Sequence, residues 1–438
     1  MGPDDANTLD LPAAAPAMSD DGPRRALSRR RFLATAAGIL ASGGVVGPGL
    51  ASTTERERLV PLGTQPAALP ERQHAWEATL ARDAHGNAIA PRFDRLLFFD
   101  VVKPPGERDV RVLEASLRGL ERAYRWGPEG LLFTAGWGPH YFAHVLGVAS
   151  PIPPPKELSA FELPSFDDYD LCLHLASDEE QRLAEVELAL VHGRPLPAAG
   201  PLDLSGSLRW RETRTGFTGA GLPAAHQRVN GIPAGDPVPA SAPLFMGFKS
   251  GLTKNQATED DVTITAGPFA GGTTMQVSYM RLRLQSWYTL LNEEERVARM
   301  YAPEVTAAQV ARFTTDAPSD PERYAYAARR YGVVGHAQTS ARARVHGRPR
   351  IIRRDFDTVD GGLAGLHFVS IQRSIADFVT TRTAMNAANA SFLNPAIGDT
   401  LNNGINQFIF VLKRANYILP PRATRSYPLA PAQRAALG

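Results

Sequence analysis

The sequence predicts an α+β protein made of two tandem ferredoxin-like domains whose antiparallel sheets pack together, as in a dimeric α/β barrel. Three observations predict this fold. Short apolar runs of strand length alternate with segments whose apolar residues recur at helical spacing. Their order in the first half is β-α-β-β-α-β, which defines the ferredoxin-like unit. The second half repeats that order in outline around one long insertion.

Length and composition support two domains of ordinary globular type. The chain has 438 residues, of which 43% are hydrophobic and 21% are charged. A formal net charge of +2 provides no broad basic face, so no nucleic-acid partner is expected. Cys172 is the single cysteine, which excludes an internal disulfide and a cysteine-based zinc site.

Residues 1–51 have the features of an export signal. Ser28 to Leu33 read SRRRFL, the form of a twin-arginine signal, and a mild apolar run follows at 34–50. That run is short for a bilayer and rich in glycine, so no stable membrane insertion is expected. The twin-arginine route carries folded proteins, which favours a cofactor inserted before export. We therefore expect a periplasmic or extracellular protein, with cleavage near Ala51.

The first predicted domain covers 93–220. Residues 52–92, before it, have no sustained period and are interpreted as a linker plus an N-terminal extension. The patterns predict strands at 95–102, 130–138, 167–177 and 205–217, and helices at 110–126 and 179–191.

The second predicted domain covers 244–425. A Pro/Gly-rich connector at 221–243 precedes it, and is interpreted as a domain boundary or a long functional loop. The patterns predict strands at 273–287, 365–374 and 406–413, helices at 289–301 and 375–386, and an insertion from about 302 to 363.

The candidate site lies in the segment 331–354, YGVVGHAQTSARARVHGRPRIIRR. His336 ends an apolar run, and Arg353 and Arg354 follow two β-branched residues. An imidazole can hold an iron, and a guanidinium keeps its charge and can steady negative charge on a bound oxygen species. The alternative for His336 taken alone is a core histidine with no ligand.

Four segments support the first interpretation, because in this order and spacing they resemble the dye-decolourising (DyP-type) haem peroxidases. The resemblance covers roughly residues 90 to 425, and its segments are GWGPHYF (136–142), GFKSGLTKN (247–255), GPFAGGTTMQVSYMRLRLQSW (267–287), and GHAQTSARA (335–343) followed by IIRR (351–354).

The resemblance implies a cofactor and residue roles. Haem b would lie in the second domain, with His336 as the axial ligand of the iron. Arg353 would be the distal arginine, or Arg354 if the register is shifted by one. Gly247, Phe248 and Gly251 would line the haem site. Hydrogen peroxide and small organic electron donors, bulky phenols or dyes, would be the partners.

Ser250 departs from the family at a catalytic position. The family's GxxDG aspartate moves a proton between the peroxide oxygens, and this chain has GFKSG there. Serine has no group that titrates near neutral pH, so it cannot act as a general base. Arg353 with an ordered water could suffice, or Glu259, Asp260 or Asp261 could approach, or the site could bind haem without turnover.

A second departure concerns support of the axial histidine. Family members usually place a carboxylate on the helix after the GLHFVSIQR strand, and the candidates there are Asp377, Asn386 and Asn389, with no clear match. The sequence therefore predicts an exported haem peroxidase of modest activity. The alternative is a haem-binding or structural member of the fold with little turnover.

Other features carry weaker hypotheses. His140 and His144 are four residues apart, but no glutamate lies between them to complete a zinc motif. The arginines within 329–350 form a basic cluster that either pairs with haem propionates or faces solvent. The sequence leaves the oligomeric state open, a homo-oligomer included.

Overall fold

The computed structural model describes residues 68–83, 86–196, 199, 202, 204–248, 255–312, 321–386 and 388–437. All of them lie within one compact unit, 57–438. The predicted signal region 1–51 is outside the described residues.

The first half contains the predicted β-α-β-β-α-β series. Its elements are β1 (Phe93–Val101), α2 (Glu107–Ala123), β2 (Leu132–Trp137), β4 (Leu171–Ser177), α3 (Glu180–His192) and β5 (Leu208–Phe217). Short additions are the 3₁₀ helix η2 (Glu77–Thr79), the π-helix η3 (Tyr141–Val145) and β3 (Ser165–Phe166).

The second half has more helices. The short α4 (Leu222–Ala225) and α5 (Glu259–Val262) precede β6 (Thr273–Leu282). There follow α6 (Leu284–Leu290), α7 (Glu293–Met300), α8 (Ala307–Arg312), α9 (Pro321–Tyr331), α10 (His336–Ala341), β7 (Ile352–Arg353), β8 (Phe356–Thr358) and η4 (Asp360–Gly362). The chain ends with β9 (Gly365–Gln372), α11 (Ile375–Ala384), α12 (Ala388–Leu393), β10 (Ile409–Leu419), η5 (Arg422–Thr424) and α13 (Pro431–Leu437).

The strands form one mainly antiparallel sheet that closes into a barrel. The order is β2-β4-β1-β5-β8-β9-β6-β10-β3, with β7 paired to β9. Closure comes from the pairing of Ile418 in β10 with Trp137 in β2. The halves are also joined by Phe217 in β5 and Asp357 in β8. The α+β class and the antiparallel pairing are thus confirmed, while the division into two domains stays a prediction.

Two predicted boundaries were wrong. The strand expected to reach Trp287 ends at Leu282, because Leu284 and Trp287 follow at helical spacing and are buried on one side of α6. The insertion expected up to 363 includes β7 and β8, which join the sheet. Each of these strands is only two or three residues long, so neither has the apolar run by which the longer strands were predicted.

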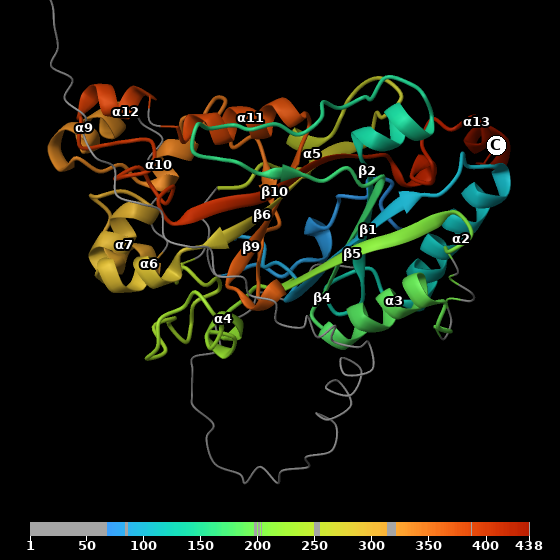
Figure 1. Cartoon of the computed structure of the whole chain (residues 1–438), viewed down its shortest axis with the longest axis horizontal. Coiled ribbons are helices and arrows are strands. Elements are labelled where there is room, and N and C mark those ends of the chain that lie inside the picture. Colours follow the sequence, from blue (N-terminus) through green and yellow to red (C-terminus); the bar gives the residue numbers. More distant parts are fainter. Residues whose placement is uncertain are drawn as a thin grey trace, which may run out of the picture. The chain divides into compact units, whose positions relative to one another are not determined.

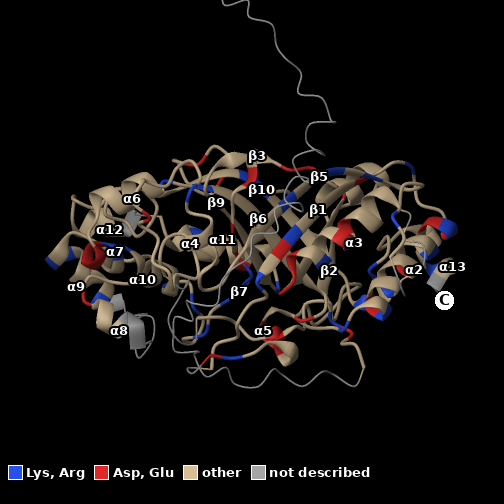
Figure 2. Ribbon diagram, turned by 90° about the horizontal axis from the view of Figure 1, so that it is seen from below, with Lys and Arg blue, Asp and Glu red and all other residues tan. Residues whose placement is uncertain are grey.

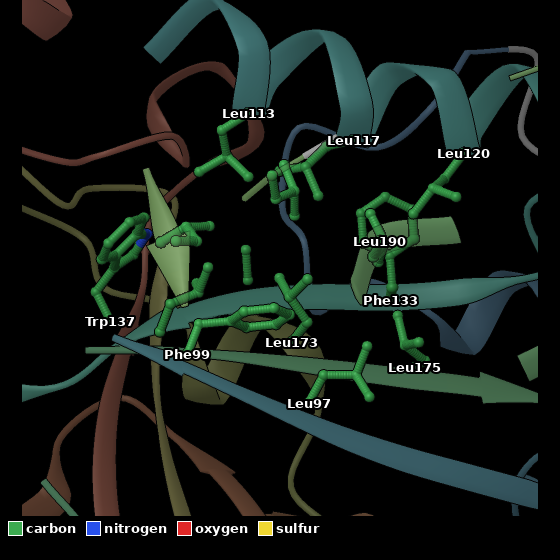
Figure 3. Packing of buried hydrophobic residues seen from close by; sticks show 14 of the residues in the cluster. Leu97, Phe99, Leu113, Leu117, Leu120, Phe133, Trp137, Leu173, Leu175 and Leu190 are labelled. Carbon is green, nitrogen blue, oxygen red and sulfur yellow. The ribbon is translucent and has the colours of Figure 1, made fainter. Parts of the chain in front are cut away.

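Helices cover the sheet in two groups (Figure 1). The view shows α2, α3 and α13 at one end of the strands, and α6, α7, α9, α10 and α12 at the other. In the first group, α2 has leucines at positions 113, 117 and 120, spaced three and four residues apart. These leucines point at the apolar face of β1, β2 and β4 (Figure 3). A second cluster, inside the barrel, joins Phe98, Met275, Val369 and Tyr417.

The described part of the N-terminal extension is packed on the barrel. His74 and Trp76 are buried, and the Trp76 ring lies 5.4 Å from the ring of His174. The described residues His74 and Trp76 of the predicted N-terminal extension are therefore part of the packed structure.

Charged residues of both signs are interspersed along the described ribbon (Figure 2), which agrees with the small net charge. Among the described residues, every helix is too short or too polar to cross a membrane.

Candidate functional site

An apolar cavity with an empty volume of about 850 Å³ lies between the second-half strands and the helices α10 and α11. Its lining is mostly Leu, Ile, Met, Phe and Val. The polar lining is small and consists of Ser278, His336, Arg353, Asp355, Asp357, Arg382 and Arg414. An apolar lining with a few convergent polar groups is typical of ligand and cofactor sites.

His336 is the first residue of α10, and close backbone contacts fix its position. The side chain of Gln338 accepts a hydrogen bond of 2.9 Å from the N–H of Gly335, which begins the helix. A Cβ on Gly335 would lie 1.9 Å from the Tyr301 carbonyl oxygen, and one on Gly404 would lie 2.9 Å from the His336 Cα. Only glycine fits at either position, so His336 is held between two segments distant in sequence.

The imidazole of His336 is neutral at physiological pH. Burial, together with the positive charges of Arg353 and Arg382, lowers its pKa to about 3. The side chain keeps some accessible surface, and it lines the cavity. A neutral imidazole facing a cavity has a lone pair available for a metal.

The segment that contains β7 and β8 alternates between the two sides of the sheet. Arg353, Asp355 and Asp357, two residues apart, all line the apolar cavity. Phe356, between them, packs inside the barrel with Phe98. Strand geometry therefore places two carboxyl groups beside the predicted distal arginine.

Arg354 faces the other way. Its guanidinium carbon lies 3.6 Å from the centre of the Trp76 ring, and Nη2 donates a 2.6 Å hydrogen bond to the carbonyl of His74. Burial lowers its pKa to about 10. The structure therefore brings Arg353, not Arg354, to the cavity that His336 lines.

Asp355 and Asp357 have different surroundings. Burial raises the pKa of Asp355, and the Arg353 charge acts against this rise. Burial raises the pKa of Asp357 well above its usual value, although its Oδ2 accepts a 2.5 Å hydrogen bond from the Phe245 N–H. The other oxygen, Oδ1, is buried with no hydrogen-bond partner among the described residues. Burial therefore opposes ionisation of Asp357 more strongly than it opposes ionisation of Asp355.

The GFKSG segment is described only in part. Gly247 has φ +90°, a left-handed conformation that suits glycine, and Phe248 lines the apolar cavity. The Phe248 ring packs edge-on against Tyr301, with ring centres 5.7 Å apart. Ser250 and Gly251 lie outside the described residues.

The acidic run after this segment is engaged elsewhere. Glu259 Oε1 accepts hydrogen bonds from the N–H groups of Trp76 and Glu77, at 2.6 and 2.8 Å. Asp260 pairs with Arg72, and Asp261 bonds to Thr258 at the start of α5. This run is absent from the described lining of the cavity, so the alternative that one of its members approaches the site stays a hypothesis.

The residues of α11 considered as supports of His336 have other partners. Asp377 pairs with Arg350 at 2.9 Å, and Asn386 accepts a 3.0 Å bond from Arg382. Arg382 is the α11 residue whose charge acts on His336. The residue of α11 that acts on His336 is therefore a cation, and the sequence offered no clear match for the carboxylate that family members usually place there.

Arg382 belongs to a buried network. Its Nε donates a 2.8 Å bond to Glu162, whose second carboxylate oxygen lies 3.0 Å from Nη2 of Arg414. Burial would raise the pKa of Glu162, but Arg382 and Arg414 outweigh it and the pKa is lowered. One carboxylate thus bridges two guanidinium groups at the cavity wall, and these three groups carry a net charge of +1.

An arginine-lined cavity of about 740 Å³ adjoins the apolar one. The two share His336, Arg353 and Arg382, and the adjoining cavity also touches Arg344 and Arg350 of the predicted basic cluster. These cations line an interior surface, as the propionate hypothesis requires.

His140 and His144 do not form a larger ligand set. Their rings stack with centres 4.4 Å apart, and His140 Nδ1 lies 2.7 Å from Asp170. Across the described residues, no group of three or more His, Cys, Asp or Glu side chains could hold a metal ion.

Sequence reasoning missed Asp355, Asp357, Arg382 and Arg414. The first two had a usable signal, because residues 353, 355 and 357 alternate in RRDFD. Arg382 and Arg414 had no such signal in the sequence. Arg414, for example, follows Lys413, and two adjacent cations do not indicate a buried position. The burial of both arginines depends on Glu162, more than two hundred residues away.

Comparison with known families gives one match. A family of unknown function, DUF7405, matches residues 91–421. A search of curated proteins finds no match.

Solved structures with the same fold are DyP-type peroxidases. A DypB variant of Rhodococcus jostii RHA1 in complex with heme aligns with a TM-score of 0.53 at 15% identity, covering 81% of this chain and 98% of that chain. A DyP-type peroxidase from Cellulomonas bogoriensis gives 0.51 at 18% identity, covering 86% and 96%. A dye-decolorizing protein from V. cholerae gives 0.51 at 15%, covering 77% and 96%. The chain therefore has the DyP-type fold.

Proposed function

We propose that this chain, which belongs to the DUF7405 family of unknown function and has the DyP-type fold, is an exported haem peroxidase. It would reduce hydrogen peroxide and oxidise bulky phenolic or dye-like donors. We propose haem b as its cofactor, two ferredoxin-like domains, and a periplasmic or extracellular location. A homo-oligomer is compatible with this function.

The observation that carries the proposal is a neutral imidazole at an apolar cavity that also contains a permanently charged guanidinium. The neutral form of His336 is the form that binds iron. The apolar lining suits a porphyrin ring. Asp357, which also lines the cavity, has a buried Oδ1 with no hydrogen-bond partner among the described residues, so it could bond to a bound group. These residues fit a haem group.

Each part of the site has a role in this proposal. His336 would hold the iron, and Arg344 and Arg350 would attract the haem carboxylates. Haem, when bound, supplies the electrons that break the peroxide O–O bond. Arg353 would stabilise negative charge that develops on the peroxide oxygen, because its charge is retained at every relevant pH.

Haem binding with little turnover is the second candidate. Arg382 favours it, since a cation near His336 weakens electron donation by the imidazole, whereas a carboxylate would strengthen it. The DyP-type fold is compatible with both candidates.

Haem titration tests the first half of the proposal. The purified protein is expected to develop a Soret band with stoichiometric haem, and His336→Ala is expected to lose that band because the iron loses its ligand. The exposed His144 provides the control, and His144→Ala should bind haem like the wild type. Haem-free wild-type protein after titration with excess haem would contradict both candidates.

Peroxide turnover separates the two candidates. A peroxidase should oxidise a phenolic donor, and Arg353→Ala should abolish this oxidation while the Soret band remains. Haem binding without measurable turnover in the wild type would favour the second candidate.

A further inference from the structure

The replacement of the family's catalytic aspartate by Ser250 raises the question of which group moves the proton. Peroxide chemistry needs a proton acceptor beside the bound ligand, and arginine cannot accept one. The acidic run at 259–261 contacts Arg72, Trp76, Glu77 and Thr258 instead of the cavity. A carboxylate acceptor would therefore come from another part of the chain.

Two carboxyl groups line the cavity that His336 and Arg353 also line. Alternation along β7 and β8 places Asp355 and Asp357 on the face of Arg353. The Asp357 carboxyl is bonded to the Phe245 N–H and lies wholly buried. Asp355 retains some accessible surface, so it is the carboxyl group that a small molecule in the cavity can reach.

The positive charge of Arg353 favours the ionised form of the Asp355 carboxyl group. Arg353 stabilises its anionic form, and Arg382, Arg414 and neutral His336 line the same cavity. Burial raises the pKa of Asp357 well above its usual value, so a second negative charge beside Asp355 is disfavoured. Neighbouring carboxyl groups with separated pKa values are a common arrangement for proton transfer.

We propose that Asp355 is the catalytic proton acceptor of this site, in place of the aspartate that Ser250 replaces. The inference rests on the proposed peroxidase function. The carboxylate takes a proton from one oxygen of hydrogen peroxide and gives it to the other, which leaves as part of water. Asp355 thus ends each cycle in its original ionised state.

Binding of hydrogen cyanide to the haem-loaded protein tests this assignment without turnover. Hydrogen cyanide binds iron as the anion, so it must lose its proton in the cavity. Because burial raises the pKa of Asp355, the wild-type binding rate should fall as pH falls through a value above that of an ordinary aspartate, about 3.9. Asp355→Asn should slow binding by about 10²- to 10⁴-fold and remove this pH dependence.

Two variants control the experiment. The exposed Asp260, paired with Arg72, supplies a matched substitution, and Asp260→Asn should keep the wild-type rate and profile. Adding Ser250→Asp to Asp355→Asn should restore much of the rate, because it returns a carboxylate at the family's position. Equal rates in the wild type and Asp355→Asn, with a normal Soret band in both, would overturn the assignment of Asp355 alone.

A measurement on the haem-free protein gives an independent readout. With aspartate carboxyl groups labelled with ¹³C, the resonance missing from Asp355→Asn should titrate above the ordinary range, and Arg353→Gln should raise its pKa further. An ordinary pKa that is insensitive to Arg353→Gln would overturn the assignment. A different outcome concerns the proposed function itself. If the wild type failed to bind haem, the peroxidase proposal would be overturned, and the proposed proton transfer from peroxide would fall with it.

Discussion

Arg353 and Arg354 show how one step along a strand separates two roles. Arg353 and His336 line the same cavity, whereas the guanidinium of Arg354 stacks on the ring of Trp76. Similarly, His336 and His74 both have a pKa lowered to about 3 by burial, but only His336 faces a cavity. The type of residue is therefore a weaker guide to its role than the face it occupies.

His74 should make the folded state sensitive to acid. Its Nε2 lies 2.8 Å from Thr263 Oγ1, whose hydroxyl donates to the Glu259 carbonyl, so Nε2 carries the hydrogen and Nδ1 is buried without a partner. Burial, then the charges of Arg354 and Arg72, lower the pKa to about 3. Between pH 6.5 and 3 the unfolded chain therefore binds a proton that the folded chain does not.

The resulting stability is complete above pH 6.5 and declines as pH falls. At pH 5 the loss attributable to His74 is about 2 kcal/mol. In urea unfolding at pH 7 and pH 5, His74→Gln should lose about this much less stability on acidification than the wild type. The exposed His144 serves as control through His144→Gln. An unchanged pH dependence in His74→Gln would contradict this account.

At the scale of elements, α10 is positioned by a distant segment. The N–H of Gly404 donates a 2.8 Å bond to the Val334 carbonyl, and the same residue has φ +54°. Contact with the backbone of His336 leaves no room for a side chain at Gly404. The segment before β10 thus fixes the histidine at the start of α10.

Gly404→Ala should displace His336 and destabilise the fold. The left-handed backbone costs about 1 kcal/mol for alanine, and the contact at 2.9 Å with the His336 Cα adds to it. Haem affinity should therefore fall together with the free energy of unfolding. Gly398→Ala is the control, because a Cβ there meets its nearest atom at 3.8 Å. Equal haem affinities for the two variants would show that Gly404 does not position His336.

At the scale of the whole described unit, the C-terminal segment ties β10 back to the first half. Arg425 is fully buried and lies 3.2 Å from Glu114 and 2.5 Å from Glu121, both on α2. Its carbonyl accepts a 2.7 Å bond from the Trp137 indole, beside the strand pair that closes the barrel. Burial of this ion pair links the end of the chain to barrel closure.

Arg425→Ala should destabilise the protein by about 3 kcal/mol, because Glu114 and Glu121 lose a fully buried guanidinium and keep only Arg118 and Arg422 as cationic partners. The free energy of unfolding in urea at pH 7 measures this loss. Arg434→Ala, at an exposed position of α13, should change stability by less than about 0.5 kcal/mol. Similar losses in both variants would mean that the buried pair is not what stabilises closure.

Much of the fold was predictable because its signals are local. The run at 95–102 and the leucines of α2 carry clear apolar periods, and both elements form within a few residues of the expected bounds. Less was predictable in the second half, where β10 runs to Leu419 past Arg414 and Asn416. Arg414 pairs with Glu162, and the Asn416 amide donates to the Pro153 carbonyl, and no local pattern reveals these distant partners.

By itself, the sequence determined the α+β class, the order of the main strands and helices, and the candidates His336 and Arg353. These depend on periodicity and residue chemistry, which the chain carries at each position. Only the tertiary structure decided that Arg353 and not Arg354 reaches the cavity, that Asp355 and Asp357 accompany it, and that Arg382 stands beside His336. Such choices depend on strand register and on burial between distant segments, and neither is a property of a local stretch of sequence.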